Sequence, residues 1–73
     1  MGLNQVKLGA QVTVEKIIAT DNIQQRLRDF GLVPGTKVVC RYRSPGGQVT
    51  ALSFRSAVIA MRTRDLQMIR VRC

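Results

Sequence analysis

A tight turn at Pro34-Gly35 is the feature that most limits how this chain can fold. Pro34 fixes φ at the first central position of a β-turn, and Gly35 can supply the positive φ that a type II turn needs at the second. Gly31 stands a few residues earlier and can adopt the left-handed conformation in which many helices end. We therefore expect a helix to end at Gly31 and a strand to begin soon after Gly35.

The segment from Asp21 to Phe30 has helical periodicity. Ile23, Leu27 and Phe30 stand at positions i, i+4 and i+7 and form one apolar stripe. Asp21 is expected to accept a hydrogen bond from an early backbone N–H, and Gln24 to reach back to it in a capping box. Because so short a helix is marginal alone, we expect its stripe to pack against a sheet.

Five other segments have the short alternating or apolar patterns of β-strands. In the first of them Val12 and Val14 alternate with polar residues, and a slip of the alternation at Ile17 and Ile18 predicts a bulge or a change of face. Residues 44–47 (S-P-G-G) are expected to form a turn. The expected strands are Gln11–Ile18, Lys37–Arg43, Gln48–Phe54, Ala57–Arg62 and Gln67–Arg72.

Two local expectations complete this description. Thr63 is expected to be the N-cap of a single helical turn, residues 63–66, between the last two strands. Alternation in the second strand assigns its side chains to two faces. These faces carry Val38, Cys40 and Tyr42 on one side, and Val39, Arg41 and Arg43 on the other.

Together these elements predict a mainly-β fold, a small five-stranded barrel with one short α-helix inserted after the first strand. Closure into a barrel removes the exposed edges of a flat sheet. With 73 residues and no long linker, the chain is expected to be a single domain, residues 1–73. The predicted core consists of Val12, Val14, Ile23, Leu27, Phe30, Val38, Cys40, Ile59, Ile69 and Val71.

The net charge of +8 is the strongest compositional signal, with 12 Lys and Arg residues against four acids. Such a balance favours an acidic partner: nucleic acid, a phospholipid surface or an acidic protein face. The alternative is a solvated basic face, because Arg41, Arg43, Arg70 and Arg72 alternate with apolar positions.

Reactive chemistry has little support in the sequence. There is no His, and the four acids are scattered, so no nucleophile can be paired with a base. Transition-metal sites need clustered His or Cys, and the two cysteines, Cys40 and Cys73, stand far apart. We expect no catalytic residue, no metal ligand, no cofactor and no disulfide between these cysteines.

Nothing in the sequence predicts direct insertion into a membrane. No apolar run approaches the roughly 18 residues that a membrane helix needs. Met1–Leu8 lacks the apolar region of a signal peptide. We therefore expect a cytoplasmic protein, recruited to the inner face of the membrane only by a partner.

Several segments together resemble the FeoA family, and the resemblance extends from Leu8-Gly9 to Val71. The most specific of them is the R-L-x-x-x-G-L-x-P-G-T run. Two positions depart from the family pattern: Ser56 stands where Gly is usual, and Leu66 where a smaller residue is usual. The matching segments are R-L-R-D-F-G-L-V-P-G-T-K-V (Arg26–Val38), S-P-G-G (44–47), I-A-M-R (Ile59–Arg62) and I-R-V (Ile69–Val71).

The resemblance implies an SH3-like barrel and a cytosolic accessory of FeoB, a membrane ferrous-iron transporter whose cytosolic part carries a GTP-binding domain. Family descriptions often mention transition-metal binding, which we interpret as a label of the pathway, because this sequence has no cluster of ligands. Our hypothesis is a non-enzymatic protein that docks on FeoB and modulates iron uptake. The expected contact residues are Val33, Pro34, Arg41 and Arg43, while Leu32 is expected to pack beside the helix.

Two alternatives from other classes stay open. Small basic barrels bind nucleic acid, but stacking of bases needs exposed aromatic rings, and Phe30 and Phe54 are expected to be buried, which leaves Tyr42. Self-association through a strand edge or through the turn at Val33 would give a homo-oligomer.

Overall fold

The computed structural model describes residues 1–72, and the mainly-β prediction is confirmed. Within these residues the chain forms five strands, one α-helix and two short 3₁₀ helices. In chain order the elements are η1 (Leu3–Gln5), β1 (Gln11–Ile17), α1 (Asp21–Phe30), β2 (Lys37–Arg43), β3 (Val49–Phe54), β4 (Ala57–Arg62), η2 (Thr63–Met68) and β5 (Ile69–Arg72).

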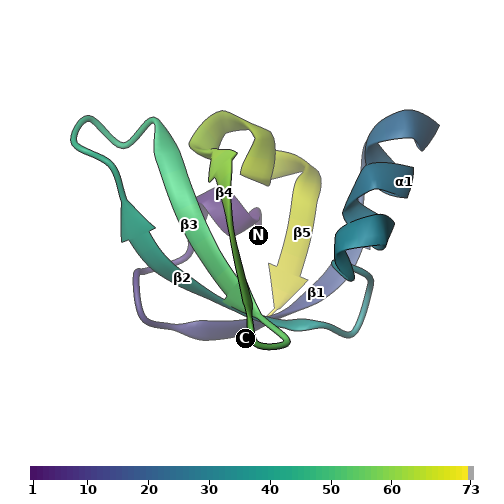
Figure 1. Cartoon of the computed structure of the whole chain (residues 1–73), viewed down its shortest axis with the longest axis horizontal. Coiled ribbons are helices and arrows are strands. Elements are labelled where there is room, and N and C mark those ends of the chain that lie inside the picture. The colour runs from purple at the N-terminus through teal and green to yellow at the C-terminus, as the bar shows by residue number, and fades with distance from the viewer. Residues whose placement is uncertain (73) are drawn as a thin grey trace.

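The strands form one antiparallel sheet with the order β4-β3-β2-β1-β5. The sheet curls around the core, and α1 stands to one side of it (Figure 1). β4 and β5 are the two edges of the sheet, and within residues 1–72 no backbone ladder joins them. The barrel is therefore open along one side.

The start of α1 differs from the predicted capping box. Thr20 is the N-cap, and its hydroxyl accepts a hydrogen bond from the Ile23 N–H at 3.4 Å. The Gln24 amide donates to the Ala19 carbonyl at 2.9 Å instead of reaching back to the cap. Asp21 is the first helical residue, where its charge complements the positive end of the helix dipole. The prediction was wrong by one residue because Thr also makes a good N-cap.

The end of α1 and the turn after it agree with the prediction. Gly31 is left-handed, with φ of 91°, and ends the helix. The Thr36 N–H donates to the Val33 carbonyl at 3.0 Å, which closes a turn around Pro34 and Gly35. Gly35 has φ of 93°, as a type II turn requires. The turn leads the chain directly from the helix into β2.

The two hairpin turns differ in how well their residues suit them. At the β2–β3 turn the Gly47 N–H donates to the Ser44 carbonyl at 2.7 Å, as the S-P-G-G segment predicts. At the β3–β4 turn Arg55 and Ser56 have φ of 50° and 64°. Two successive positive φ values define a type I′ turn, which favours Asn and Gly. The β3–β4 turn is therefore strained at the position where the FeoA resemblance places Gly.

A bulge in β2 reverses the predicted faces at the end of that strand. The pairing of β2 with β3 shifts register between Cys40 and Tyr42. A bulge adds one residue to one strand and so inverts the alternation beyond it. As a result Tyr42 is 59% exposed, whereas Arg43 is half-buried.

A second bulge, in β1, lies earlier than predicted. The pairing of β1 with β5 shifts register between Val14 and Lys16, not at Ile17 and Ile18. At this bulge two successive residues, Glu15 and Lys16, are exposed. The bend lets β1 pair with β2 at one end and with β5 at the other.

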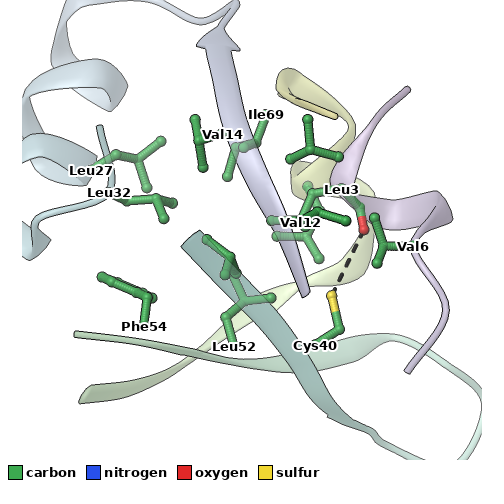
Figure 2. Packing of buried hydrophobic residues seen from close by; sticks show 13 residues of the cluster. Leu3, Val6, Val12, Val14, Leu27, Leu32, Cys40, Leu52, Phe54 and Ile69 are labelled. Carbon is green, nitrogen blue, oxygen red and sulfur yellow. Dashed lines mark hydrogen bonds between the residues drawn. The ribbon is translucent and has the colours of Figure 1, made fainter. Parts of the chain in front are cut away.

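The core draws on the strands and on the segments that cover them (Figure 2). Leu27 and Leu32 enter it from the side of α1, and Leu3 and Val6 from the N-terminal segment. Leu32 is fully buried, as expected. The buried set is Leu3, Val6, Val12, Val14, Leu27, Leu32, Val38, Cys40, Leu52, Phe54, Leu66, Ile69 and Val71.

Phe30 is a correction to the predicted core, because its side chain is 57% exposed. Ile23 and Ile59 are only partly buried at the edge of the core. Of the helix stripe, Leu27 alone is buried. The reason is the position of α1: it stands to one side of the curled sheet and does not lie across its face (Figure 1).

The segment before β5 also differs from prediction. Thr63 lies inside η2, and its hydroxyl is 2.7 Å from the Thr50 hydroxyl, so it does not cap the helix. η2 continues to Met68, and β5 therefore begins at Ile69 instead of Gln67. This longer helix buries Leu66.

Candidate functional site

An apolar groove of about 400 Å³ lies between α1 and β4, at the open side of the barrel. We call it the α1–β4 groove. It is formed by the apolar stripe of α1, the middle of β4 and part of η2. The lining residues are Ile23, Arg26, Leu27 and Phe30 of α1, Ile59, Ala60 and Met61 of β4, and Asp65 and Met68 of η2.

The local sequences explain why the groove is apolar. β4 reads A-V-I-A-M-R, so it has apolar residues on both faces. Ile59 and Met61 are half-buried, whereas Val58 is 66% exposed on the other face. Met61 and Met68 are flexible and polarizable, a property that suits a surface which adapts to a ligand. The groove therefore offers an unfilled apolar contact surface.

Basic residues stand at both ends of β4. Arg55 occupies the turn from which β4 starts, and Arg62 and Arg64 stand where β4 passes into η2. All three side chains are exposed. Arg26 belongs to the lining itself, where Asp65 is the only acid. An occupant with acidic flanks would meet these charges favourably.

A second, shallower concave surface of about 450 Å³ surrounds the Gly35 turn. We call it the basic concavity. Lys37, Arg41 and Arg55 are exposed around it, so it favours an anionic group. Its lining consists of Gln11, Gly35, Thr36, Lys37, Val39, Arg41, Ser53, Phe54 and Arg55.

Three of the four contact residues predicted from the sequence lie at or near this basic concavity. Arg41 lines it directly. Val33 and Pro34 belong to the adjoining turn, where Val33 is half-buried and Pro34 is exposed. The turn and Arg41 thus belong to one neighbourhood. Arg43, the fourth, does not line this concavity.

Arg43 makes its contacts inside the molecule. Its guanidinium donates hydrogen bonds to the carbonyls of Asn4 and Val6, at 3.2 and 3.0 Å. Its Nε donates to the Thr50 hydroxyl at 3.3 Å. These three bonds tie the N-terminal segment to β2 and β3. We assign Arg43 a structural role, because the β2 bulge turns it inward.

The α1–β4 groove was not predicted from the sequence. Ile23 and Phe30 were assigned to the core, and Met61 and Met68 were given no role. One signal was present: the apolar residues of β4 occupy both alternating sets, unlike a strand with one solvated face. Such a pattern indicates a strand that another surface covers.

Cys40 has the environment of an inert core residue. It is fully buried, with its Sγ 4.0 Å from the Leu3 carbonyl oxygen (Figure 2). Burial raises the pKa of the Cys40 thiol, and the positive charge of Arg43 only partly opposes this. A protonated, buried thiol behaves as a small hydrophobe. Cys73, and with it the disulfide question, lies outside the described residues.

The part of the chain that the structure describes has neither a cluster of metal ligands nor a membrane-spanning helix. Residues 1–72 contain no group of three or more His, Cys, Asp or Glu side chains that could hold a metal ion. Over the same residues no helix has the length and apolar character needed to cross a bilayer.

The amino-acid sequence matches the model of one protein family over its whole length. That family is described as the FeoA domain, and the match covers residues 1–73. A comparison with curated proteins found no match.

Solved structures of FeoA proteins share the fold. The FeoA protein of Chlorobium tepidum is 28% identical, with a TM-score of 0.91 over 97% of this chain and 68% of that one. The FeoA-like protein of Clostridium acetobutylicum is also 28% identical, with a TM-score of 0.87 over 99% and 84%. The zinc complex of Stenotrophomonas maltophilia FeoA, described as a prokaryotic SH3 domain protein, is 28% identical, with a TM-score of 0.85 over 99% and 89%. The SH3-like prediction is thereby confirmed.

Proposed function

The chain belongs to the FeoA family, and we propose that it is an accessory protein of ferrous iron transport that acts by binding to another protein. The Stenotrophomonas maltophilia relative is described as a suggested activating factor of bacterial ferrous iron transport. The observation that carries the proposal is the α1–β4 groove, an apolar surface along a strand that has basic residues at both ends. Apolar patches rimmed by polar residues mark interaction sites on small proteins.

The proposed partner is the cytosolic, GTP-binding part of a FeoB-type membrane transporter. A small protein without reactive groups can regulate a transporter by binding one conformation more tightly than another. Its net charge of +8 would accelerate the encounter with an acidic face of the partner. In this proposal the protein is cytosolic and reaches the membrane only through FeoB.

The two surfaces have different roles in this proposal. The α1–β4 groove supplies short-range apolar contact, which governs the lifetime of the complex. The basic concavity, with Val33, Pro34 and Arg41 at or near it, supplies electrostatic steering. High salt should therefore slow association more than it speeds dissociation.

The proposal is tested by measuring binding to the isolated cytosolic region of FeoB. Calorimetry with a GTP analogue, with GDP and without nucleotide should detect a complex in at least one state. Affinity should differ between nucleotide states, since regulation requires differential binding. Absence of a complex in every state would refute the assignment of this partner.

Nucleic acid is the second candidate, and the basic concavity is the observation that favours it. Phe30 is 57% and Tyr42 59% exposed, so two aromatic rings are accessible, although they belong to different elements. Phe54 is buried, as predicted. If nucleic acid is the partner, the logarithm of the binding constant should fall steeply and linearly with that of salt concentration. A shallow dependence would exclude it.

A further inference from the structure

The fold covers one edge of its sheet and leaves the other edge bare. Along β5, the Val71 N–H donates to the Met1 carbonyl at 2.8 Å, and Gly2 forms an isolated antiparallel bridge with Arg70. The N-terminal segment thus acts as a partial sixth strand. Along β4, within residues 1–72, no segment pairs with the outer edge. Bare edges attract other strands, and proteins usually protect them.

The register of β4 identifies which of its backbone groups are free. The Thr63 N–H donates to the Gln48 carbonyl at 2.8 Å, which sets the phase of the β3–β4 ladder. Hydrogen-bonded and non-bonded pairs alternate along an antiparallel ladder. Counting back through the paired residues, the N–H and C=O groups of Val58, Ala60 and Arg62 therefore point away from β3.

These free groups lie beside the α1–β4 groove. Ala60 itself lines the groove, between Ile59 and Met61. A strand added to β4 would direct alternate side chains to opposite faces, because side chains alternate along a strand. One set would fall into the space between β4 and α1, against Phe30. Backbone pairing would then supply affinity, and the groove would supply selectivity.

We propose that β4 accepts an extended segment of the protein partner by antiparallel or parallel strand addition, with alternate apolar side chains of that segment in the α1–β4 groove. The inference rests on the proposed function, because it specifies how the partner binds. It assigns the contact to backbone groups at Val58, Ala60 and Arg62. Such a contact cannot be recognised from the residue types in the sequence.

The charges at the two ends of β4 favour one kind of partner segment. Arg55 stands at one end of β4, and Arg62 and Arg64 stand at the other. An apolar segment with acidic residues on both sides complements this arrangement. A second copy of this chain does not, because each copy carries a net charge of +8 and the edges would bring like charges together.

The first experiment compares two substitutions of Ala60. Ala60→Pro removes the outward N–H without breaking a bond to β3, and proline is tolerated where a strand N–H faces solvent. Ala60→Val keeps the N–H and is the matched control. For the FeoB cytosolic region, Ala60→Pro should weaken affinity by about ten-fold or more relative to Ala60→Val, which measures the effect of added bulk in the groove. Equal affinities of the two variants would overturn strand addition, while the binding of wild type would preserve the proposed function.

The second experiment is independent of FeoB and of the folding of any variant. The probe is a short capped peptide of alternating Val and Thr with Asp at both ends. Hydrogen exchange in wild type should show the amides of Val58, Ala60 and Arg62 exchanging rapidly in the free protein and slowing when the peptide is added.

The exchange pattern separates the possible outcomes. Protection at those three amides supports strand addition even if the FeoB region does not bind, in which case only the partner was wrongly assigned. A helical or globular occupant of the groove would contact Phe30 and Met61 without slowing the Ala60 amide, and would refute the proposal. Protection that appears with rising protein concentration alone would assign the edge to a second copy and would refute it as well.

Discussion

The two edges of the sheet show how a chain of 73 residues distributes its apolar residues between buried and exposed positions. At the β5 edge the N-terminal segment pairs with the strand and buries Leu3 completely. At the β4 edge the strand has no covering segment within residues 1–72, and Val58 remains 66% exposed. The first edge is completed by the chain itself, and the second is the one for which we propose strand addition.

The difference has an energetic meaning. A small domain buries a modest fraction of its surface, so each buried apolar side chain matters to its stability. Leaving Phe30 and Val58 largely exposed forgoes part of that stability. The comparison predicts that changes at the covered edge affect folding, and that changes at the bare edge affect binding.

The largest expected effect is at Leu3. Leu3→Ala should lower the free energy of unfolding by about 2–5 kcal/mol, because it opens a cavity in the core under the covering segment. Equilibrium urea unfolding measures it. The control is Leu8→Ala, at a residue that is 43% exposed, with an expected change below about 1 kcal/mol. If the two variants are equally stable, the N-terminal segment does not contribute to the fold as described.

A smaller effect is expected at Arg43, which ties the covering segment to the sheet. Arg43→Met should cost about 1–3 kcal/mol of unfolding free energy, because the Asn4 and Val6 carbonyls lose their donor. Arg41→Met, two residues away and exposed, should change stability by less than about 0.5 kcal/mol. Thermal unfolding of the two variants measures this difference in stability. A larger cost at Arg41 would reverse the roles assigned to these arginines.

At the bare edge we expect substitutions to change binding affinity more than stability. Phe30→Ala should weaken binding to the FeoB region by about ten-fold, a loss of ~1.4 kcal/mol, because an aromatic side chain leaves the groove. Its stability should change by less than about 1 kcal/mol, since the ring is 57% exposed. Tyr42→Ala, at 59% exposure but outside the groove lining, is the matched control and should bind normally. Equal losses from both would place the contact elsewhere.

The strands and the helix were largely predictable from the sequence, but the covering of the β5 edge by the N-terminal segment and the groove beside β4 were not. Strands, the helix and the Pro34-Gly35 turn follow from local periodicity and backbone preference, which act within a few residues. The inward turn of Arg43 depends on a bulge that two strands form together, so no single strand encodes it. Phe30 fits a helical stripe equally well whether a sheet or a partner covers it. The position of α1 decides between these outcomes, and that position is a tertiary property.

The smallest expected effect concerns the turn that connects the bare strand to the rest of the sheet. Ser56→Gly should raise the free energy of unfolding by about 0.5–1 kcal/mol, because Ser56 has φ of 64° and glycine adopts this conformation without strain. Ser53→Gly, within β3, should lower it by a similar amount, since glycine weakens a strand interior. Denaturant unfolding of both variants measures whether the free energy of unfolding rises or falls as expected. Because Ser56 lies outside the groove lining, relief of its backbone strain should leave the affinity for the FeoB region unchanged. A gain in stability accompanied by a loss of binding would mean that the strained turn holds β4 in the geometry its partner needs, and the bare edge would then depend on strain as well as on exposure.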